Sequence, residues 1–238
     1  MHTLVVESWS RGSSPLHVRD PRAKLGALLV FLIAVATTRP GDHRAFALYA
    51  ALLLVSAIIA RLPVPALLAR VALVLPFSAV FAAITWWAGD PARALSLAEK
   101  SLVSGFAALL LIATTPFYDL MRALESLAVP RALILVIQFV YRYIFVISEQ
   151  AQHMRLAAQC RQGRGHGQRL SARFRAAGGA LGVLFARSWE RAGGIYRAML
   201  ARGFTGHFPR LALARFRTAD ALFLLIAISA SVGIRLAL

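Results

Sequence analysis

The residues best suited to chemistry are arginines at the ends of long amphipathic segments. The run MLARGFTG, residues 199–206, places Arg202 directly before Gly203 at the end of an arginine-rich amphipathic stretch. Glycine readily adopts the left-handed conformation that closes a helix, and this would leave Arg202 near the negative end of the helix dipole. The planar guanidinium suits carboxylates and carbonyls. This helix end therefore predicts a docking contact with a soluble partner.

A second set of residues, His153, Cys160 and His166, has the chemistry of transition-metal ligands. His153 and Cys160 are seven residues apart and fit one helix face, and His166 follows in a glycine-rich loop. Two ligands without a third make a poor site, so we favour an ordinary helix face and expect no metal or cofactor. Because GxxxxGK[ST], HExxH and GxSxG motifs are missing from the sequence, we expect no catalytic residue either.

The composition is typical of an integral membrane protein. Of the 238 residues, 59% are apolar, and the mean hydropathy of +0.66 is high for a globule of this size. A net charge of +17 would favour nucleic acid as the partner of a soluble protein. Here the basic residues alternate with apolar stripes and separate apolar spans, as the positive-inside rule describes, so we exclude nucleic acid. The apolar stretches cover residues 25–38, 45–60, 71–89, 101–119 and 221–234.

The charge distribution predicts the topology. Basic residues before the first span place the N-terminus in the cytoplasm, and residues 148–218 carry thirteen basic residues against Glu149 and Glu190. Both regions on one side require an even number of crossings between them. The stretch 132–147 contains Arg142, which is costly in hydrocarbon. We therefore interpret residues 131 to about 161 as one helix that enters the membrane boundary obliquely and continues as an amphipathic rod.

The predicted fold is an all-α integral membrane protein with about five transmembrane helices. It divides into a four-span membrane domain (residues 1–119), a cytoplasmic domain (115–217) and a last span (218–238). The cytoplasmic domain contains one short helix, capped by Thr115 and ended by Pro130, and two long amphipathic helices. Apolar residues recur at spacings of three and four in both long helices, which predicts a crossed or antiparallel pair with mated seams. We expect Arg142 to form a buried polar contact with this pair of helices.

Four segments carry a resemblance to a known family. They are DPRAKL (residues 20–25), TTPFYDLMRALESLAVPRAL (114–133), QFVYRYIFVISEQAQHMRLAAQ (138–159) and MLARGF (199–204). Together they resemble the transmembrane T component of energy-coupling-factor transporters, in particular the cobalt type called CbiQ. The resemblance covers most of the chain. The proline-bearing segment and the last motif are its most specific parts.

The resemblance implies a role for particular residues. In the family, two coupling helices each end in an Ala-Arg-Gly motif whose arginine sits in a groove of an ATPase subunit. Ala201, Arg202 and Gly203 match the second motif. The first motif is degraded, and either Arg161 or Arg164 takes its arginine role. Candidates for structural or coupling roles are Pro130, Arg142 and Asp119, although dipole stabilisation of a first helical turn explains Asp119 equally well.

The resemblance also implies the partners. The expected machine joins this non-catalytic scaffold to two ATPase subunits of the CbiO type, which bind ATP and magnesium. A substrate-binding membrane subunit of the CbiM type completes it, with a CbiN-type subunit as a further possibility. The setting is the bacterial inner membrane, in contact with lipid. Cobalt and nickel remain open as substrates, and the alternatives are a shared T component of a vitamin transporter, an amphipathic lipid-binding protein and a membrane enzyme.

Overall fold

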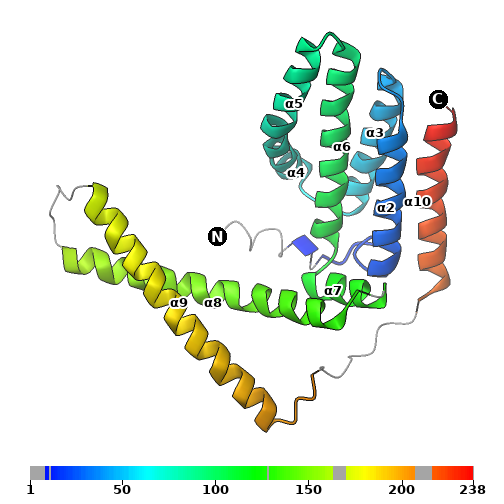
Figure 1. Ribbon diagram of the computed structural model, residues 1–238. Coiled ribbons are helices and arrows are strands. Elements are labelled where there is room, and N and C mark those ends of the chain that lie inside the picture. The colour runs from blue at the N-terminus through cyan, green and yellow to red at the C-terminus, as the bar shows by residue number, and fades with distance from the viewer. Residues whose placement is uncertain (1–8, 11, 128, 163–169, 207–215, 238) are drawn as a thin grey trace. The chain divides into compact units, whose positions relative to one another are not determined.

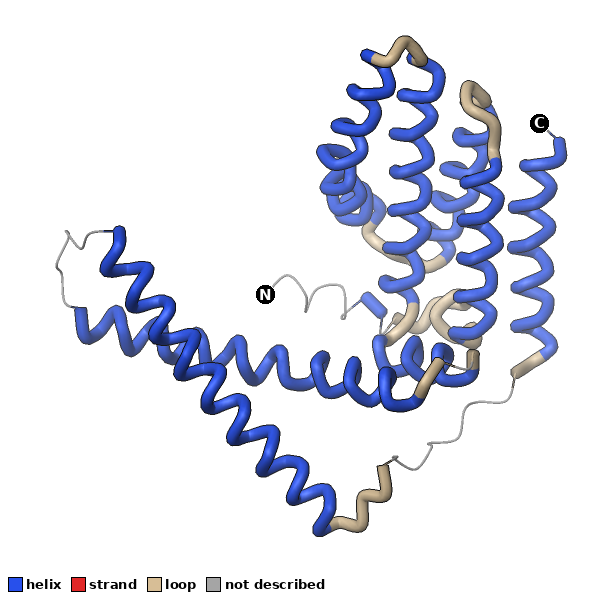
Figure 2. Tube along the Cα trace, viewed as in Figure 1, coloured by secondary structure: helices blue, strands red, loops and turns tan. Residues whose placement is uncertain are grey.

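The computed structural model describes residues 9–10, 12–127, 129–162, 170–206 and 216–237, and the regular elements in these ranges are all helices (Figure 1 and Figure 2). The chain forms two compact units. Residues 1–127 and 213–238 form one, here called the membrane unit, and residues 128–212 form the other, here called the long-helix unit. The membrane unit contains α2 (Pro21–Thr37), α3 (His43–Ile59), α4 (Val64–Val71), α5 (Leu75–Trp87), α6 (Pro91–Thr114), α7 (Phe117–Ser126) and α10 (Thr218–Ala237).

Aspartates begin three helices of the membrane unit. The side chain of Asp20 accepts a hydrogen bond from the Arg22 amide at the start of α2, and Asp42 and Asp90 serve α3 and α6 in the same way. Each carboxylate satisfies an amide that has no partner inside the helix and faces the positive end of the dipole. Few acidic residues are present in this chain, and several of them are used to start helices.

The core of the membrane unit lies between α2, α3, α4 and α6. Phe31 of α2 packs edge-on against Tyr49 of α3, with ring centroids 5.4 Å apart. Tyr49 is fully buried, and its hydroxyl donates to the Ser231 carbonyl of α10 over 3.4 Å. α10 lies beside α2, so the last helix of the chain returns to the first (Figure 1).

The helical stretch from α4 to α5 changes its geometry once. A short 3₁₀ turn, η1 (Ala72–Val74), joins the two α-helices immediately before Leu75 and Pro76. Proline has no amide hydrogen, and its ring clashes with the carbonyl four residues earlier, here that of Ala72. The tighter 3₁₀ turn accommodates this missing bond without ending the helical path.

The helices that could cross a bilayer differ from the expected set. Four helical stretches in the described residues are long and apolar enough by length and composition: Val64–Trp87, Pro91–Thr114, Arg131–Arg161 and Thr218–Leu236. Three of these match expected spans. The fourth belongs to α8, which the charge argument places outside the membrane. By contrast α2 and α3 have 17 residues each, about 26 Å at 1.5 Å per residue, slightly less than a 30 Å hydrocarbon core.

The long-helix unit contains α8 (Arg131–Gln162) and α9 (Leu170–Ala201), each of 32 residues. The continuous helix expected from residue 131 to about 161 is confirmed. α8 and α9 cross each other (Figure 1). Ala180, Leu184 and Ser188 of α9 are partly buried and follow one another at intervals of four, a row suited to ridge-into-groove packing.

Candidate functional site

The end of α9 is closed by glycine, as the sequence predicts. Gly203 has φ +80°, its amide donates to the Leu200 carbonyl over 2.9 Å, and the Phe204 amide donates to the Met199 carbonyl over 3.0 Å. These two bonds form a Schellman motif, which satisfies carbonyls that the helix leaves free. The chain therefore turns sharply at a defined position, immediately after Arg202.

Arg202 is presented at this closed end. Its side chain is exposed, and the structure shows no ion pair for it within the described part of the chain. The carbonyl end of the helix dipole favours a cation here, so the guanidinium is stabilised without a carboxylate that would neutralise it. The backbone at Arg202 is fixed and its guanidinium has no paired carboxylate among the described residues. This arrangement suits recognition of a partner's carboxylates or carbonyls.

The end of α8 provides the second expected contact only in part. Arg161 lies in the last turn of α8 and is exposed. Arg164, the other candidate for the degraded motif, lies outside the described residues. The structure therefore places a basic side chain at the end of each long helix, Arg161 on α8 and Arg202 next to α9.

The predicted mating of apolar seams is wrong for α9. Its seam carries the large side chains of Phe174, Leu181, Phe185 and Trp189, which are 67–74% exposed. The partly buried row of α9 instead contains Ala180, Leu184 and Ser188, of which two are small. Small side chains let two helices approach closely at a crossing, while a large angle between the helices prevents contact along their lengths. This face, here called the aromatic face of α9, is consequently uncovered within the described residues of the long-helix unit.

The predicted buried position of Arg142 is also wrong. Arg142 is exposed on α8, and its guanidinium carbon lies 5.8 Å from the centre of the Tyr143 ring. A cation beside an aromatic ring at this distance gains a modest electrostatic attraction. Arg142 therefore forms no buried tie within the described chain, although its neighbours Val140 and Ile144 are apolar and exposed as well.

The short helix α7 lies with the membrane unit and packs on α2, whereas the sequence analysis groups it with the long helices. Asp119 is in its first turn and forms an ion pair with Arg122 at 3.5 Å. Thr115 does not cap α7, because Pro116 occupies that position and Thr115 ends α6. Proline lacks a side-chain acceptor, so this helix begins without a side-chain cap.

Pro130 separates α7 from α8, as predicted. Its carbonyl accepts hydrogen bonds from the amides of Leu133 at 3.0 Å and Ile134 at 3.3 Å, which starts α8. A proline at a helix start loses nothing, since its missing amide would have no helical partner there. Pro130 thus marks the start of a new helix.

A lysine network inside the membrane unit was not anticipated. Lys24 is buried, and its ammonium donates to the Thr114 carbonyl at 2.8 Å, the His17 carbonyl at 3.2 Å and the Thr115 hydroxyl at 3.3 Å. Three acceptors match the three donors of an ammonium group. Lys24 thus caps the end of α6 from the start of α2.

The same region joins α10 to the start of α2. Asp220 is buried; one of its oxygens accepts from the Asp20 amide at 3.1 Å and the other accepts from the Arg217 amide at 3.0 Å. The signal for this network was the polar segment DPRAK directly before an apolar span. A lysine one turn inside a span needs acceptors, but the sequence does not say which distant backbone supplies them.

The described residues contain no group of three His, Cys, Asp or Glu that could hold a metal ion. His153 lies 3.8 Å from Glu149 on the same helix face, and both side chains are largely exposed. Cys160 is a free, exposed thiol. His166 lies outside the described residues, so the three-residue set considered from the sequence is not tested as a whole.

The helices and their ends define an all-α, multi-pass membrane protein whose two long amphipathic helices present basic side chains. The family model of the cobalt transport protein CbiQ matches residues 12–211. The chain belongs to this CbiQ family.

Individual relatives cover smaller parts of the chain. The chain is 29% identical to the nickel permease LarQ of Lactiplantibacillus plantarum, over 55% of this chain and 46% of that protein. It is 28% identical to the cobalt transport protein CbiQ of Rhodobacter capsulatus, over 49% of this chain and 46% of that protein. It is 29% identical to the uncharacterized protein MJ1089 of Methanocaldococcus jannaschii, over 46% of this chain and 40% of that protein. The chain spans less than half the length of each of these relatives.

Proposed function

We propose that the chain is the non-catalytic coupling subunit of an ATP-driven cobalt or nickel uptake transporter of the energy-coupling-factor type. In this role it links two ATPase subunits to a membrane subunit that binds the substrate. The CbiQ family membership supports transport, and the names of the two transport relatives support cobalt or nickel as the cargo. ATP and magnesium are bound by the partner ATPases. The proposed location is the bacterial cytoplasmic membrane, with the long-helix unit on the inner side.

The observation that carries the proposal is the presentation of Arg202. A docking contact must survive repeated force, so its backbone must be fixed while its side chain stays available. The Schellman motif at Gly203 supplies the first condition, and the exposed guanidinium supplies the second. ATP-driven closure of the two ATPases would then move the helix ends, and the long helices would transmit that displacement by shear or hinge motion.

The uncovered aromatic face of α9 supports the existence of protein partners. Large apolar side chains exposed over several turns lower the solubility of an isolated chain, and such patches commonly mark interaction sites. Assembly with the other subunits would bury this face. The alternative of lipid binding through the same helices predicts that the arginines along α9 contribute alike, whereas coupling makes the terminal arginine special.

The test is charge reversal at Arg202 in the assembled transporter. We expect Arg202→Glu to weaken retention of the ATPase subunits at least about tenfold, because hydrogen bonds to a charged group contribute about 1.5–3 kcal/mol. Radioactive cobalt and nickel uptake should fall in parallel. Arg191→Glu is the matched control, since Arg191 is exposed on the same helix and lies about 15 Å before its end. Equal losses for both variants, or intact uptake in Arg202→Glu, would contradict the docking role.

A further inference from the structure

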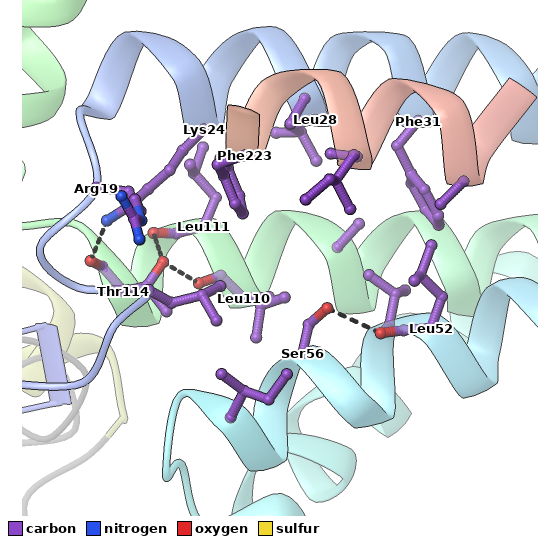
Figure 3. A pocket seen from close by; sticks show the side chains of 18 of the residues that line it. Arg19, Lys24, Leu28, Phe31, Leu52, Ser56, Leu110, Leu111, Thr114 and Phe223 are labelled. Carbon is purple, nitrogen blue, oxygen red and sulfur yellow. Dashed lines mark hydrogen bonds between the residues drawn. The ribbon is translucent and has the colours of Figure 1, made fainter. Parts of the chain in front are cut away.

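The membrane unit contains a cavity that the coupling role does not use. Its volume is about 430 Å³, and it lies between α2, α3, α6 and α10. Most of its lining is aliphatic or aromatic, while Arg19, Lys24 and Thr114 lie together at one end (Figure 3). Pockets of this volume hold small organic ligands, and the lining predicts a mostly apolar one.

The cavity is elongated along the helices. α10 lines it from Ala219 to Ser231, a rise of about 18 Å, and α2 lines it from Lys24 to Phe31, a rise of about 10 Å. Spans in a bilayer run roughly parallel to the lipid chains, and one leaflet of hydrocarbon is about 15 Å thick. A slot of this length and direction matches one extended acyl chain.

One wall of the cavity opens sideways. Val55 and Ile59 of α3 and Leu222 and Ile226 of α10 all line the cavity, yet they remain 48–60% exposed. Side chains that contact both the cavity and the outside border an opening between these two helices. In a bilayer this outside is hydrocarbon, so a lipid chain could enter laterally without crossing water.

The polar end has one cation with unused hydrogen-bonding capacity. Lys24 is already saturated by three acceptors. Arg19 is one-third exposed, and its ion-pair partner in the described residues, Asp220, lies at 4.0 Å. The oxygens of Asp220 accept from the backbone amides of Asp20 and Arg217. The guanidinium of Arg19 therefore keeps donors for an anion at the mouth.

We propose that this cavity, here called the acyl cavity, binds one acyl chain of an anionic glycerophospholipid whose phosphate lies beside Arg19. A basic residue near the membrane surface adds about 1 kcal/mol of attraction to an anionic headgroup, which favours an anionic over a zwitterionic lipid.

The test uses the full-length chain in mild detergent with a phosphatidylglycerol that carries a photoreactive diazirine in its acyl chain. We expect cross-links at the cavity walls of α3 and α10, mapped by mass spectrometry of peptides. Unlabelled phosphatidylglycerol should compete about fivefold better than phosphatidylcholine, the ratio that about 1 kcal/mol gives. Cross-links spread evenly over the outer surface of the helices, or equal competition by the two lipids, would overturn the proposal.

Two pairs of variants locate the site. Ala227→Phe places a ring in the cavity and should reduce cross-linking at least fivefold, whereas Ala221→Phe, at an exposed position of α10 that does not line the cavity, should leave it unchanged. Arg19→Gln should remove the preference for phosphatidylglycerol while the acyl chain still enters, and Arg19→Lys should retain most of it. If Ala227→Phe elutes as an aggregate, the two Arg19 variants still test the proposal. An unchanged lipid preference in Arg19→Gln would refute the contact between Arg19 and the headgroup.

Discussion

Two lysines hold opposite ends of one antiparallel helix pair. Lys24, at the start of α2, donates to the Thr114 carbonyl at the end of α6. Lys100 of α6 donates to the carbonyls of Ala36 at 2.9 Å and Thr38 at 2.8 Å, at the end of α2. Each cation therefore satisfies carbonyls that a helix end leaves free and faces the negative end of a dipole. These are the two lysines in the chain, and both serve as interhelical caps.

This reciprocal arrangement predicts unequal costs for the same substitution. Lys24→Met should lower the free energy of unfolding by about 1–3 kcal/mol, because it leaves buried backbone acceptors without a donor. Lys100→Met should cost less, since its acceptors lie where water can replace the ammonium. Thermal unfolding followed by tryptophan fluorescence measures both. Equal melting temperatures for Lys24→Met and the parent chain would show that the hydrogen bonds of Lys24 do not stabilise the membrane unit.

Residue-level prediction succeeded where chemistry is local. Gly203 and Arg202 were recognised because a glycine after an arginine-rich amphipathic segment has few roles other than helix closure. Pro130 was recognised for the same kind of reason. The role of Lys24 does not follow from the sequence, because two of its three acceptors come from residues about ninety positions away. The sequence predicts a buried polar contact for Arg142, yet a charged residue within an apolar helical stretch does not determine whether another element covers it.

At the scale of the element, the end of α9 shows how a glycine fixes the backbone next to an exposed arginine. The left-handed φ at Gly203 is costly for any residue with a Cβ. The hydrogen bonds that the Gly203 and Phe204 amides donate to the carbonyls of Leu200 and Met199 depend on that conformation. Altering Gly203 should therefore change where Arg202 lies, even though the arginine itself is untouched.

Gly203→Ala and Gly193→Ala should act in opposite directions. The first forces alanine into a left-handed conformation and should destabilise the helix end by about 1 kcal/mol. The second replaces an exposed helical glycine, with open space around it, and should stabilise α9 by about 0.5–1 kcal/mol. Circular dichroism during thermal unfolding measures stability, and co-purification measures ATPase binding. Coupling through the helix end would be contradicted if Gly203→Ala bound the ATPases as tightly as Gly193→Ala.

Periodicity predicted the existence and length of the long helices better than their pairing. Spacings of three and four identify an apolar face, and α8 and α9 extend as expected. The choice of the covering surface depends on crossing angle and on side-chain size, which a single helix does not encode. The partly buried row of α9 contains two small residues, Ala180 and Ser188, while Phe185 and Trp189 stay exposed within the described residues.

At the scale of the whole molecule, one helix has two possible positions relative to the bilayer. α8 meets the length and composition of a span, yet its second half is basic and amphipathic. In the proposed topology α2, α3, the α4–α5 stretch and α6 each cross the bilayer, which returns the chain to the side of the N-terminus. A further crossing by α8 would place its end on the opposite side. The coupling role requires that α8 does not cross, because its end must meet ATPases on the inner face.

The single cysteine of the chain tests this requirement directly, because Cys160 lies near the end of α8 and is exposed. Ala92→Cys, combined with Cys160→Ser, provides the reference thiol at an exposed position in the first turn of α6, after three crossings of the proposed topology. With a membrane-impermeant maleimide, Cys160 should react in inverted vesicles and the reference thiol in right-side-out vesicles. Labelling of both from one side would mean that α8 crosses the membrane. A third outcome is that Cys160 reacts in right-side-out vesicles and the reference thiol in inverted vesicles. This would mean that α8 does not cross but that the whole chain has the reverse orientation, so that its helix ends could not reach cytoplasmic ATPases.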